Sequence, residues 1–283
     1  MAALYVVGTP IGNLGDLTPR AGEVLARADL VLAEDTRRTR GLLAHLGLAK
    51  KPLERLDAHA TTRRVEGVVE RLAEGASVAL VTDAGMPGVS DPGAALVSAA
   101  RARGIPVVPI PGPSAITAAV AASGLVAGPF VFLAFLPRSG KKRRLALERI
   151  ARSQEPVVLF EAPARVASTL RDLAALAPSR PVALCRELTK VHEEILTGTL
   201  ADLAALEREW LGEVTLVVAA GHPEVEEQPS VEQLDAEILL RIEKGTHPRD
   251  LATELARRLG IARRDAYQRV LALRGQNASR AVK

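Results

Sequence analysis

The sequence predicts an α/β protein with two α/β domains and a small helical domain. Strand-like and helix-like segments alternate through the first 125 of 283 residues, and a second alternating series follows the connection Leu125 to Pro129. After residue 230 only helical patterns occur. Such alternation is typical of sheets with helices packed on their faces. We therefore expect an N-terminal α/β domain at 1–124, a C-terminal α/β domain at 125–222 and a helical domain at 231–283.

The first domain is expected to hold a mostly parallel sheet, because short apolar strands separated by helices favour parallel pairing. The predicted strands are Leu4 to Val7, Leu30 to Ala33, Ser77 to Val81 and Val107 to Ile110. Helices between them start at capping residues and end at glycine. The starts are Thr18-Pro19, Asp91-Pro92 and Ser114, and two further helices, near Arg38 to Leu46 and Thr62 to Ala73, end at Gly47 and Gly75.

The second domain repeats the pattern, and the helical domain follows an acidic linker at Glu224 to Ser230. Thr199 and Asp202 resemble a capping box that opens a helix ending near Arg208. In the helical domain, a helical apolar pattern runs from Asp250 to Arg274, with leucines on one stripe. The pattern is interrupted at Gly260 and then continues, which is typical of a helix-turn-helix or of an ordinary packed helical hairpin. The predicted strands lie near Phe130 to Ala134, Val157 to Phe160, Val182 to Cys185 and Val214 to Ala219.

Composition narrows the class of protein. Apolar residues make up 48% of the chain but aromatics only 2%, so the core must be aliphatic. The single cysteine, Cys185, excludes a disulfide framework, and the five histidines show no ligand spacing, so no metal is expected. The chain begins without a charged-then-apolar leader, so we expect a cytoplasmic protein. The uncharged stretch Gly104 to Pro137 contains many prolines and glycines, which predicts buried core and no membrane span.

Positive charge gathers in two segments, although the whole chain is only +4. Arg138 to Arg152 carries net +6 and Arg241 to Lys283 net +7, so the remainder carries −9. Basic clusters on an otherwise acidic chain favour a polyanionic partner, because neutralised phosphates release counterions. Solvent-exposed helix faces would give the same charge pattern. Charge alone therefore does not distinguish a surface that binds a polyanion from ordinary solvated helices.

Glycine-rich loops follow the predicted strands, where α/β sheets bind ligands. The loop 82–93 carries Asp83, which is placed to accept hydrogen bonds from ribose hydroxyls or an ammonium group. Ser114 opens a helix whose free N–H groups suit a carboxylate. FEAPAR (160–165) and CRELTK (185–190) end two strands of the second domain. Loops from both domains are therefore expected to enclose a cleft for an elongated, zwitterionic cofactor.

Six ordered motifs resemble the ribosomal RNA small subunit methyltransferase I family, a branch of the tetrapyrrole methylase superfamily. The resemblance covers about Leu4 to Ala220. The chain departs from the family pattern at Met86, where threonine is usual, at Ala134, where glycine is common, and in EAPAR, which replaces an E-S-P-H-R type string. The motifs are GTPIGNLGDLT (8–18), AEDTRRT (33–39), TDAGMPGVSDPG (82–93), PGPSA (111–115), FLPRSGKKRR (135–144) and RELTK (186–190).

The resemblance implies a two-domain class III methyltransferase fold, a homodimer, and S-adenosyl-L-methionine as methyl donor between the domains. The family methylates the ribose 2′-hydroxyl of a cytidine in the decoding region of 16S ribosomal RNA. This RNA, free or in the small ribosomal subunit, is therefore the expected partner. By matching motif positions, the expected cofactor contacts are Pro10, Asp83, Gly85, Met86, Ser114, Ala115, Phe160 and Leu188.

Methyl transfer to a hydroxyl needs an aligned oxygen and an acceptor for its proton. The candidate bases are Glu34, Asp35 and Glu187, and the sequence does not choose among them. Lys190 is able to stabilise the developing alkoxide. The helical tail is a further candidate for RNA contacts. The side chains expected to bind RNA phosphates are Arg37, Arg38, Arg40, Arg138, Lys141, Lys142, Arg143 and Arg144.

Two other functions remain open from the sequence. A porphyrinoid C-methyltransferase of the same superfamily would share the cofactor loops but would not need two strongly basic segments. A regulator that binds nucleic acid through the helical domain would bind no cofactor. Glycine-rich loops in both α/β halves argue against the regulator.

Overall fold

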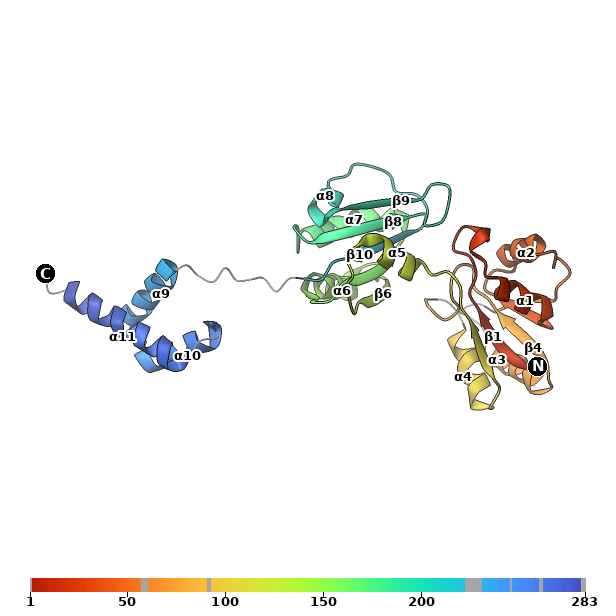
Figure 1. Ribbon diagram of the computed structural model, residues 1–283, viewed down its shortest axis with the longest axis horizontal. Coiled ribbons are helices and arrows are strands. Elements are labelled where there is room, and N and C mark those ends of the chain that lie inside the picture. Colours follow the sequence, from red (N-terminus) through yellow and green to blue (C-terminus); the bar gives the residue numbers. More distant parts are fainter. Residues whose placement is uncertain are drawn as a thin grey trace. The chain divides into compact units, whose positions relative to one another are not determined.

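A computed structural model describes residues 2–56, 61–90, 93–221, 231–244, 246–259 and 262–280 (Figure 1). The chain divides into two compact units, Met1–Gly221 and His222–Lys283. Unit 1 contains two five-stranded sheets with helices between their strands, and the described part of unit 2 is helical. The predicted α/β class is confirmed.

The first sheet is wholly parallel, with the strand order β3-β2-β4-β1-β5. Buried aliphatic residues cover both of its faces in two separate clusters, as the apolar runs predicted. The short strand β3 was not predicted. The strands are β1 (Ala3–Val7), β2 (Leu30–Ala33), β3 (Leu53–Arg55), β4 (Ser77–Leu80) and β5 (Val107–Ile110).

The helices of this half begin and end largely where the caps predicted. The Thr18 hydroxyl accepts a hydrogen bond from the Ala21 N–H at 3.2 Å, and Pro19 is the first helical residue. Gly47 and Gly75 follow helix ends with φ of +71° and +107°. The predicted cap Asp91-Pro92 lies outside the described residues. The helices are α1 (Pro19–Arg27), α2 (Thr36–His45), α3 (Thr62–Ala73) and α4 (Ala94–Ala102), with a 3₁₀ turn η1 (Leu14–Asp16).

The second sheet is mixed, with the order β6-β7-β10-β8-β9. Only β6 and β7 pair in parallel, and the other three pairs are antiparallel. The Thr199–Asp202 capping box is confirmed, but its helix ends at Ala204 and not near Arg208. The strand β9 was not predicted. The elements are β6 (Val131–Phe135), α6 (Gly140–Arg152), β7 (Val157–Glu161), α7 (Pro163–Ala174), β8 (Pro181–Arg186), β9 (Glu194–Thr199), α8 (Leu200–Ala204) and β10 (Val214–Val218).

Helix α5 (Ala115–Ser123) joins the two halves. It follows β5 in sequence, yet it packs on the second sheet against Val158, Ala183 and Val217 (Figure 1). Its small apolar side chains allow this close packing. The uncharged stretch 104–137 was predicted to be buried core, but most of it is half-buried or exposed, because it runs from one sheet to the other. Its buried residues are Ile105, Ile110, Ala119, Ser123 and Leu136. No helix in the described part of the chain is both long and apolar enough to cross a membrane.

Unit 2 has a hydrophobic core of its own. Its helices are α9 (Val231–Glu243), α10 (Pro248–Leu259) and α11 (Arg263–Arg280). Leu251 and Leu255 of the predicted stripe are buried together with Ile238 of α9 and Val270 of α11. The predicted break at Gly260 lies outside the described residues. Within the described part, the three helices pack on one another as a small bundle.

Candidate active site

Three loops meet at the carboxyl ends of β1, β4 and β5. Thr9 and Gly85 form an isolated antiparallel bridge, in which each backbone N–H donates to the other residue's carbonyl at 2.9 and 3.1 Å. The Thr9 hydroxyl adds a bond of 3.2 Å to the Thr82 carbonyl. The loop after β1 is therefore fixed to the loop after β4, as the location of the motifs led us to expect.

Two glycines let the loops after β1 and β5 touch. A Cβ atom placed on Gly8 would lie 2.7 Å from the Gly112 backbone, and one on Gly112 would lie 2.8 Å from Gly8. No side chain fits at either position without moving the backbone. These glycines therefore serve close approach of two chain segments, and no phosphate cradle is needed to explain them.

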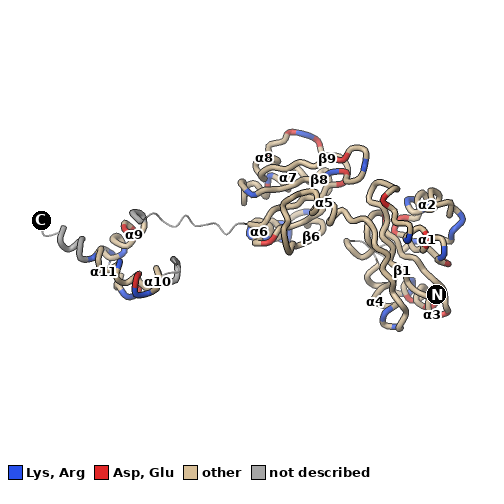
Figure 2. The backbone as a smooth tube through the Cα atoms, in the orientation of Figure 1, with Lys and Arg blue, Asp and Glu red and all other residues tan. Residues whose placement is uncertain are grey.

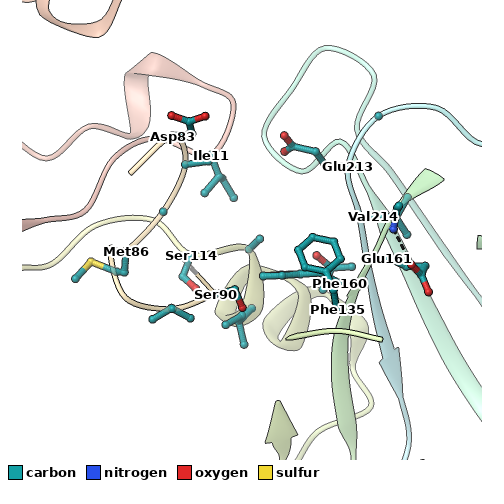
Figure 3. A pocket seen from close by; sticks show the side chains of 18 of the residues that line it. Ile11, Asp83, Met86, Ser90, Ser114, Phe135, Phe160, Glu161, Glu213 and Val214 are labelled. Carbon is teal, nitrogen blue, oxygen red and sulfur yellow. Dashed lines mark hydrogen bonds between the residues drawn. The ribbon is translucent and has the colours of Figure 1, made fainter. Parts of the chain in front are cut away.

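A cavity of about 440 Å³ opens beside these loops (Figure 3). Its walls come from both halves of unit 1: the loops after β1, β4 and β5 on one side, and β6, β7 and β10 on the other. This volume is in the range of sites that hold a cofactor-sized molecule. The predicted cleft between loops of the two halves is thus present within unit 1.

One end of the cavity is acidic and hydrogen-bonded. Asp83 lines it, and its Oδ1 accepts the Asp35 N–H at 3.0 Å while its Oδ2 lies 3.6 Å from Nε of Arg38. Glu34 lines the same end, and its Oε2 accepts the Thr82 hydroxyl at 2.9 Å. Both carboxylates keep further lone pairs for a ligand.

The start of α5 lines the cavity through Ser114, Ala115 and Ile116. Ser114 occupies the N-cap position but its hydroxyl makes no capping hydrogen bond. The first N–H groups of the helix therefore have no side-chain acceptor at the N-cap. Such a helix start attracts a carboxylate, both through these donors and through the helix dipole.

The opposite wall is aromatic. Phe160 lies on β7, and its ring centroid is 5.5 Å from that of Phe135 and 5.1 Å from that of Phe132. Phe160 and Phe135 line the cavity side by side in Figure 3. Phe160 was predicted as a contact residue, whereas Phe135 stands in the sequence only as the first residue of a motif.

Glu161 lies directly behind this wall and is fully buried. Its carboxylate accepts hydrogen bonds from the Ala162 N–H at 2.8 Å, from Nε of Arg165 at 2.7 Å and from the Thr169 hydroxyl at 2.7 Å. Arg165 in turn donates to the Leu136 carbonyl at 3.0 Å. Glu161 thus joins the end of β7 to α7, and Arg165 joins α7 to Leu136, which follows β6.

A second charged group joins the loop after β8 to β10. Lys190 Nζ donates to Oε1 of Glu187 at 2.8 Å and to Oε2 of Glu213 at 3.1 Å, and the Glu213 N–H also donates to Glu187. Glu213 lines the cavity opposite Asp83 (Figure 3). Glu187 and Lys190 do not line it. Two residues of this loop, Glu187 and Thr189, have positive φ of 52° and 68°.

These contacts set the charge states of the candidate bases. The hydrogen bond from Lys190 holds the pKa of Glu187 below its ordinary 4.5. Burial alone would lower the pKa of Lys190, but the hydrogen bonds to Glu187 and Glu213 raise it. The hydrogen bond from the Arg37 side chain holds the pKa of Asp35 far below its ordinary 3.8. Asp35 and Glu187 are therefore weak bases, and Lys190 stays protonated.

The predicted cations fall into two groups (Figure 2). Arg37, Arg38 and Arg40 lie on α2, and Arg38 reaches the cavity. Of the second group, the residues Arg138, Lys141, Lys142 and Arg144 are exposed around the start of α6. Arg143 differs, since its side chain is only 11% exposed and binds Thr169 at 3.0 Å and Asp172 at 2.9 Å. We therefore withdraw Arg143 from the expected phosphate contacts.

The cavity collects seven of the twelve residues predicted to bind the cofactor or to act in catalysis, and one of the predicted RNA contacts, Arg38. Asp83, Gly85, Met86, Ser114, Ala115 and Phe160 line it, with Glu34 and Arg38. Outside the lining are Pro10, Leu188, Asp35, Glu187 and Lys190. Leu188 is instead buried in the cluster that packs α5 on the second sheet. Lining residues that the sequence did not single out are Ile11, Val89, Ser90, Phe135, Glu161 and Glu213.

No group of three metal-ligating side chains occurs among the residues that the structure describes. Burial raises the pKa of the Cys185 thiol to about 11, so this cysteine stays protonated and unreactive. The described residues that line the cavity offer carboxylates, hydroxyls, backbone N–H groups and the Arg38 guanidinium.

Comparisons with known proteins agree with this architecture. Residues 3–204 match the tetrapyrrole (corrin/porphyrin) methylases. The chain is 41% identical over 276 residues to ribosomal RNA small subunit methyltransferase I of Synechocystis sp., covering 96% of this chain and 99% of that protein. It is 44% identical over 221 residues to the Thermotoga maritima protein of the same name, covering 77% and 99%. It is also similar to the solved uroporphyrin-III-C-methyltransferase of Thermus thermophilus, at 25% identity and a TM-score of 0.53, covering 77% and 94%.

Proposed function

The chain belongs to the ribosomal RNA small subunit methyltransferase I family of tetrapyrrole methylases, and from this premise we propose that it methylates 16S ribosomal RNA with S-adenosylmethionine. More narrowly, the acceptor is the ribose 2′-hydroxyl of a cytidine in the decoding region. The observation that carries the proposal is the cavity at which the family's loops from both halves converge. Because ribosomal RNA lies in the cytoplasm, we place the protein there.

The residues at the cavity fit S-adenosylmethionine, whose sulfonium supplies an electrophilic methyl group. The uncapped start of α5, at Ser114 and Ala115, suits its carboxylate. Asp83 suits ribose hydroxyls or the ammonium group, and the loop 82–86 with Phe160 provides an apolar surface for the nucleoside. The Gly8–Gly112 contact holds the loops after β1 and β5 together beside this cavity.

Among the candidate bases we propose Glu34. It lines the cavity and is half-buried, and its bond from the Thr82 hydroxyl fixes the orientation of the carboxylate. Asp35 is committed to Arg37, and Glu187 to Lys190. Glu34 would accept the proton of the 2′-hydroxyl, while bound S-adenosylmethionine would supply the methyl group and leave as the neutral thioether. Lys190 then acts indirectly, by holding Glu213 at the wall opposite Asp83.

The exposed cations bind the RNA backbone in this proposal. Arg37, Arg38 and Arg40 lie beside the acidic end of the cavity. Four further exposed cations follow Phe135 of its aromatic wall within nine residues of sequence: Arg138, Lys141, Lys142 and Arg144. Phosphate contacts from both sides would place a ribose over the cavity. The protein is also proposed to work as a homodimer, which sedimentation at micromolar concentration will test.

The decisive experiment is methylation of 16S RNA, free and in small subunits, with labelled S-adenosylmethionine, followed by mapping of 2′-O-methyl groups. We expect one modified cytidine in the decoding region. Glu34→Gln should lower kcat by about 10²- to 10⁴-fold while cofactor affinity, measured by calorimetry, stays unchanged. Transfer to uroporphyrinogen and none to RNA would favour a porphyrinoid methyltransferase. A protein that binds RNA but no S-adenosylmethionine would point to a regulator.

A further inference from the structure

Phe135 is an unusual side chain in this protein. The chain has only four phenylalanines, one tryptophan and two tyrosines. Phe135 is nevertheless 55% exposed, and it stands at the wall of the cavity. Phe160 contacts its ring at 5.5 Å with an interplanar angle of 55°, so the rest of the ring is open. An exposed aromatic ring at the rim of a cavity is available for contact with a ligand.

The backbone before Phe135 turns its ring toward the cavity. In a regular strand, residues 132 and 135 would point to opposite faces, because side chains alternate. Here the register of β6 with β7 shifts between Phe132 and Phe135, and Ala134 adopts a φ of +53°. As a result both phenylalanines contact Phe160. A bulge that re-aims one side chain beside a binding site is a recurrent device in sheets.

Exposed cations follow Phe135 closely in the sequence. Arg138, Lys141, Lys142 and Arg144 are all exposed within nine residues of Phe135. The Ser139 side chain makes no capping bond at the start of α6, so the first N–H groups of that helix add to the positive field. An open aromatic ring beside several cations matches the two parts of an unpaired nucleotide, since bases stack on aromatic rings and phosphates bind cations.

We propose that Phe135 is a stacking platform for an unstacked base of the acceptor RNA, at or next to the nucleotide whose ribose enters the cavity. This inference rests on the proposed function and adds to it the way in which the RNA is held. It also means that the target nucleotide is turned out of its helix or taken from a single-stranded segment, since a paired base cannot reach the ring.

The first test uses steady-state methylation of 16S RNA by Phe135→Leu, Phe135→Trp and the wild type. Stacking on one base predicts a KM for RNA about 5- to 150-fold higher in Phe135→Leu, with recovery in Phe135→Trp. Phe130→Leu is the matched control, because Phe130 is 37% exposed but does not line the cavity. The affinity for S-adenosylmethionine, measured by calorimetry, should stay the same in all four proteins.

The second test uses Phe135→Trp as a reporter. The only native tryptophan, Trp210, is buried, so a tryptophan at position 135 adds an exposed fluorophore to a constant background. Short cytidine oligonucleotides should quench the added emission, because a stacked base contacts the indole directly. Quenching equal to that of the wild type would overturn the proposal.

The outcomes separate this inference from the function on which it rests. If the wild type methylates 16S RNA and Phe135→Leu has an unchanged KM for RNA, the stacking role is wrong and the function stands. The stacking role is also wrong if Phe135→Leu loses affinity for S-adenosylmethionine alone, because the ring would then be part of the cofactor wall. A wild-type protein that neither binds nor methylates RNA overturns both.

Discussion

Ala134 holds a left-handed backbone conformation, with φ of +53°, in which a non-glycine residue is strained by about 1–2 kcal/mol. Glycine would remove this strain but gain entropy in the unfolded chain, worth about 0.4–1 kcal/mol. We therefore expect Ala134→Gly to raise the free energy of unfolding by about 0.5–1 kcal/mol in urea titrations. Ala146→Gly, within helix α6, is the control and should lower it by about 1 kcal/mol. Equal losses in both variants would show that the Ala134 backbone is unstrained.

Glu187 makes a pH-dependent contribution to stability. Its pKa in the folded protein lies below the ordinary 4.5, chiefly because Lys190 donates a hydrogen bond to it. A carboxylate of this kind stabilises the fold above its unfolded pKa and loses that effect as the pH falls through its folded pKa. Glu187→Gln should therefore cost about 1 kcal/mol at pH 7, and the difference should shrink below pH 4.5. A difference that is constant from pH 7 to pH 3 would contradict the ion pair.

Single residues also show what the sequence could predict of the site. Asp83 and Ser114 were found because each sits in a glycine-rich loop after a strand, and both line the cavity. Phe135 was missed because strand alternation gives no sign of the bulge that turns its ring. Glu213 was missed because its place depends on a hydrogen bond to Lys190, 23 residues earlier in the chain. Local sequence patterns predict where loops occur. The positions of Phe135 and Glu213 depend instead on contacts between segments that are distant in the sequence.

Helix α6 brings exposed and buried cations together within one turn. Lys141, Lys142 and Arg144 are exposed, whereas Arg143 binds Thr169 and Asp172. Changing the three exposed residues to glutamine should weaken RNA binding. The slope of log affinity against log salt should flatten by about 0.7 for each phosphate of a single strand that the protein no longer neutralises. Affinity for S-adenosylmethionine should not change. Unchanged RNA affinity would remove this helix from the RNA interface.

Arg143→Gln is the matched variant on the same helix. Its loss removes the hydrogen bonds to Thr169 and Asp172 and leaves Arg165 as the one cation paired with the buried Glu161 among the described residues, so the main effect should be on stability, at roughly 1–3 kcal/mol. The salt slope for RNA should remain close to that of the wild type. A flattened slope with unchanged stability would mean that Arg143 turns outward to bind phosphate.

The strands show where elements could be predicted and where they could not. Long apolar runs such as Val157–Glu161 were found because both faces of the strand are buried. The edge strands β3 and β9 were missed, since β3 has three residues and β9 is only partly buried along its length. The antiparallel place of β10 between β7 and β8 was also not predicted. The direction of a strand in a sheet depends on the path of the segment that connects it to the preceding strand. The periodicity of apolar residues does not predict that path.

The largest departure from the predicted organisation concerns α5. The expected boundary at residue 124 assigned this helix to the first domain, but it packs on the second sheet and carries its N-terminal end into the cavity. A mutation in the α5 interface should therefore disturb both the fold of the second sheet and the shape of the site. The two sheets form one compact unit for this reason, as the single unit Met1–Gly221 indicates.

Unit 2 should be dispensable for cofactor binding and important for RNA affinity. Its described helices close their own core, and the cavity is lined wholly by residues of unit 1. The Thermotoga maritima relative is matched over 99% of its length by only 77% of this chain. That family member is therefore shorter than this chain by about the length of unit 2.

A chain ending at residue 230 should thus bind S-adenosylmethionine with unchanged affinity and still methylate 16S RNA. Its RNA affinity should fall and depend less steeply on salt, because the removed residues 231–283 carry net +4, and the part 241–283 alone carries net +7. The full-length chain with Arg263 and Arg264 changed to glutamine is the control that removes charge and keeps the bundle. If the shortened chain loses cofactor binding while remaining folded by circular dichroism, the helical unit takes part in the site, and the methyl donor is not held by unit 1 alone.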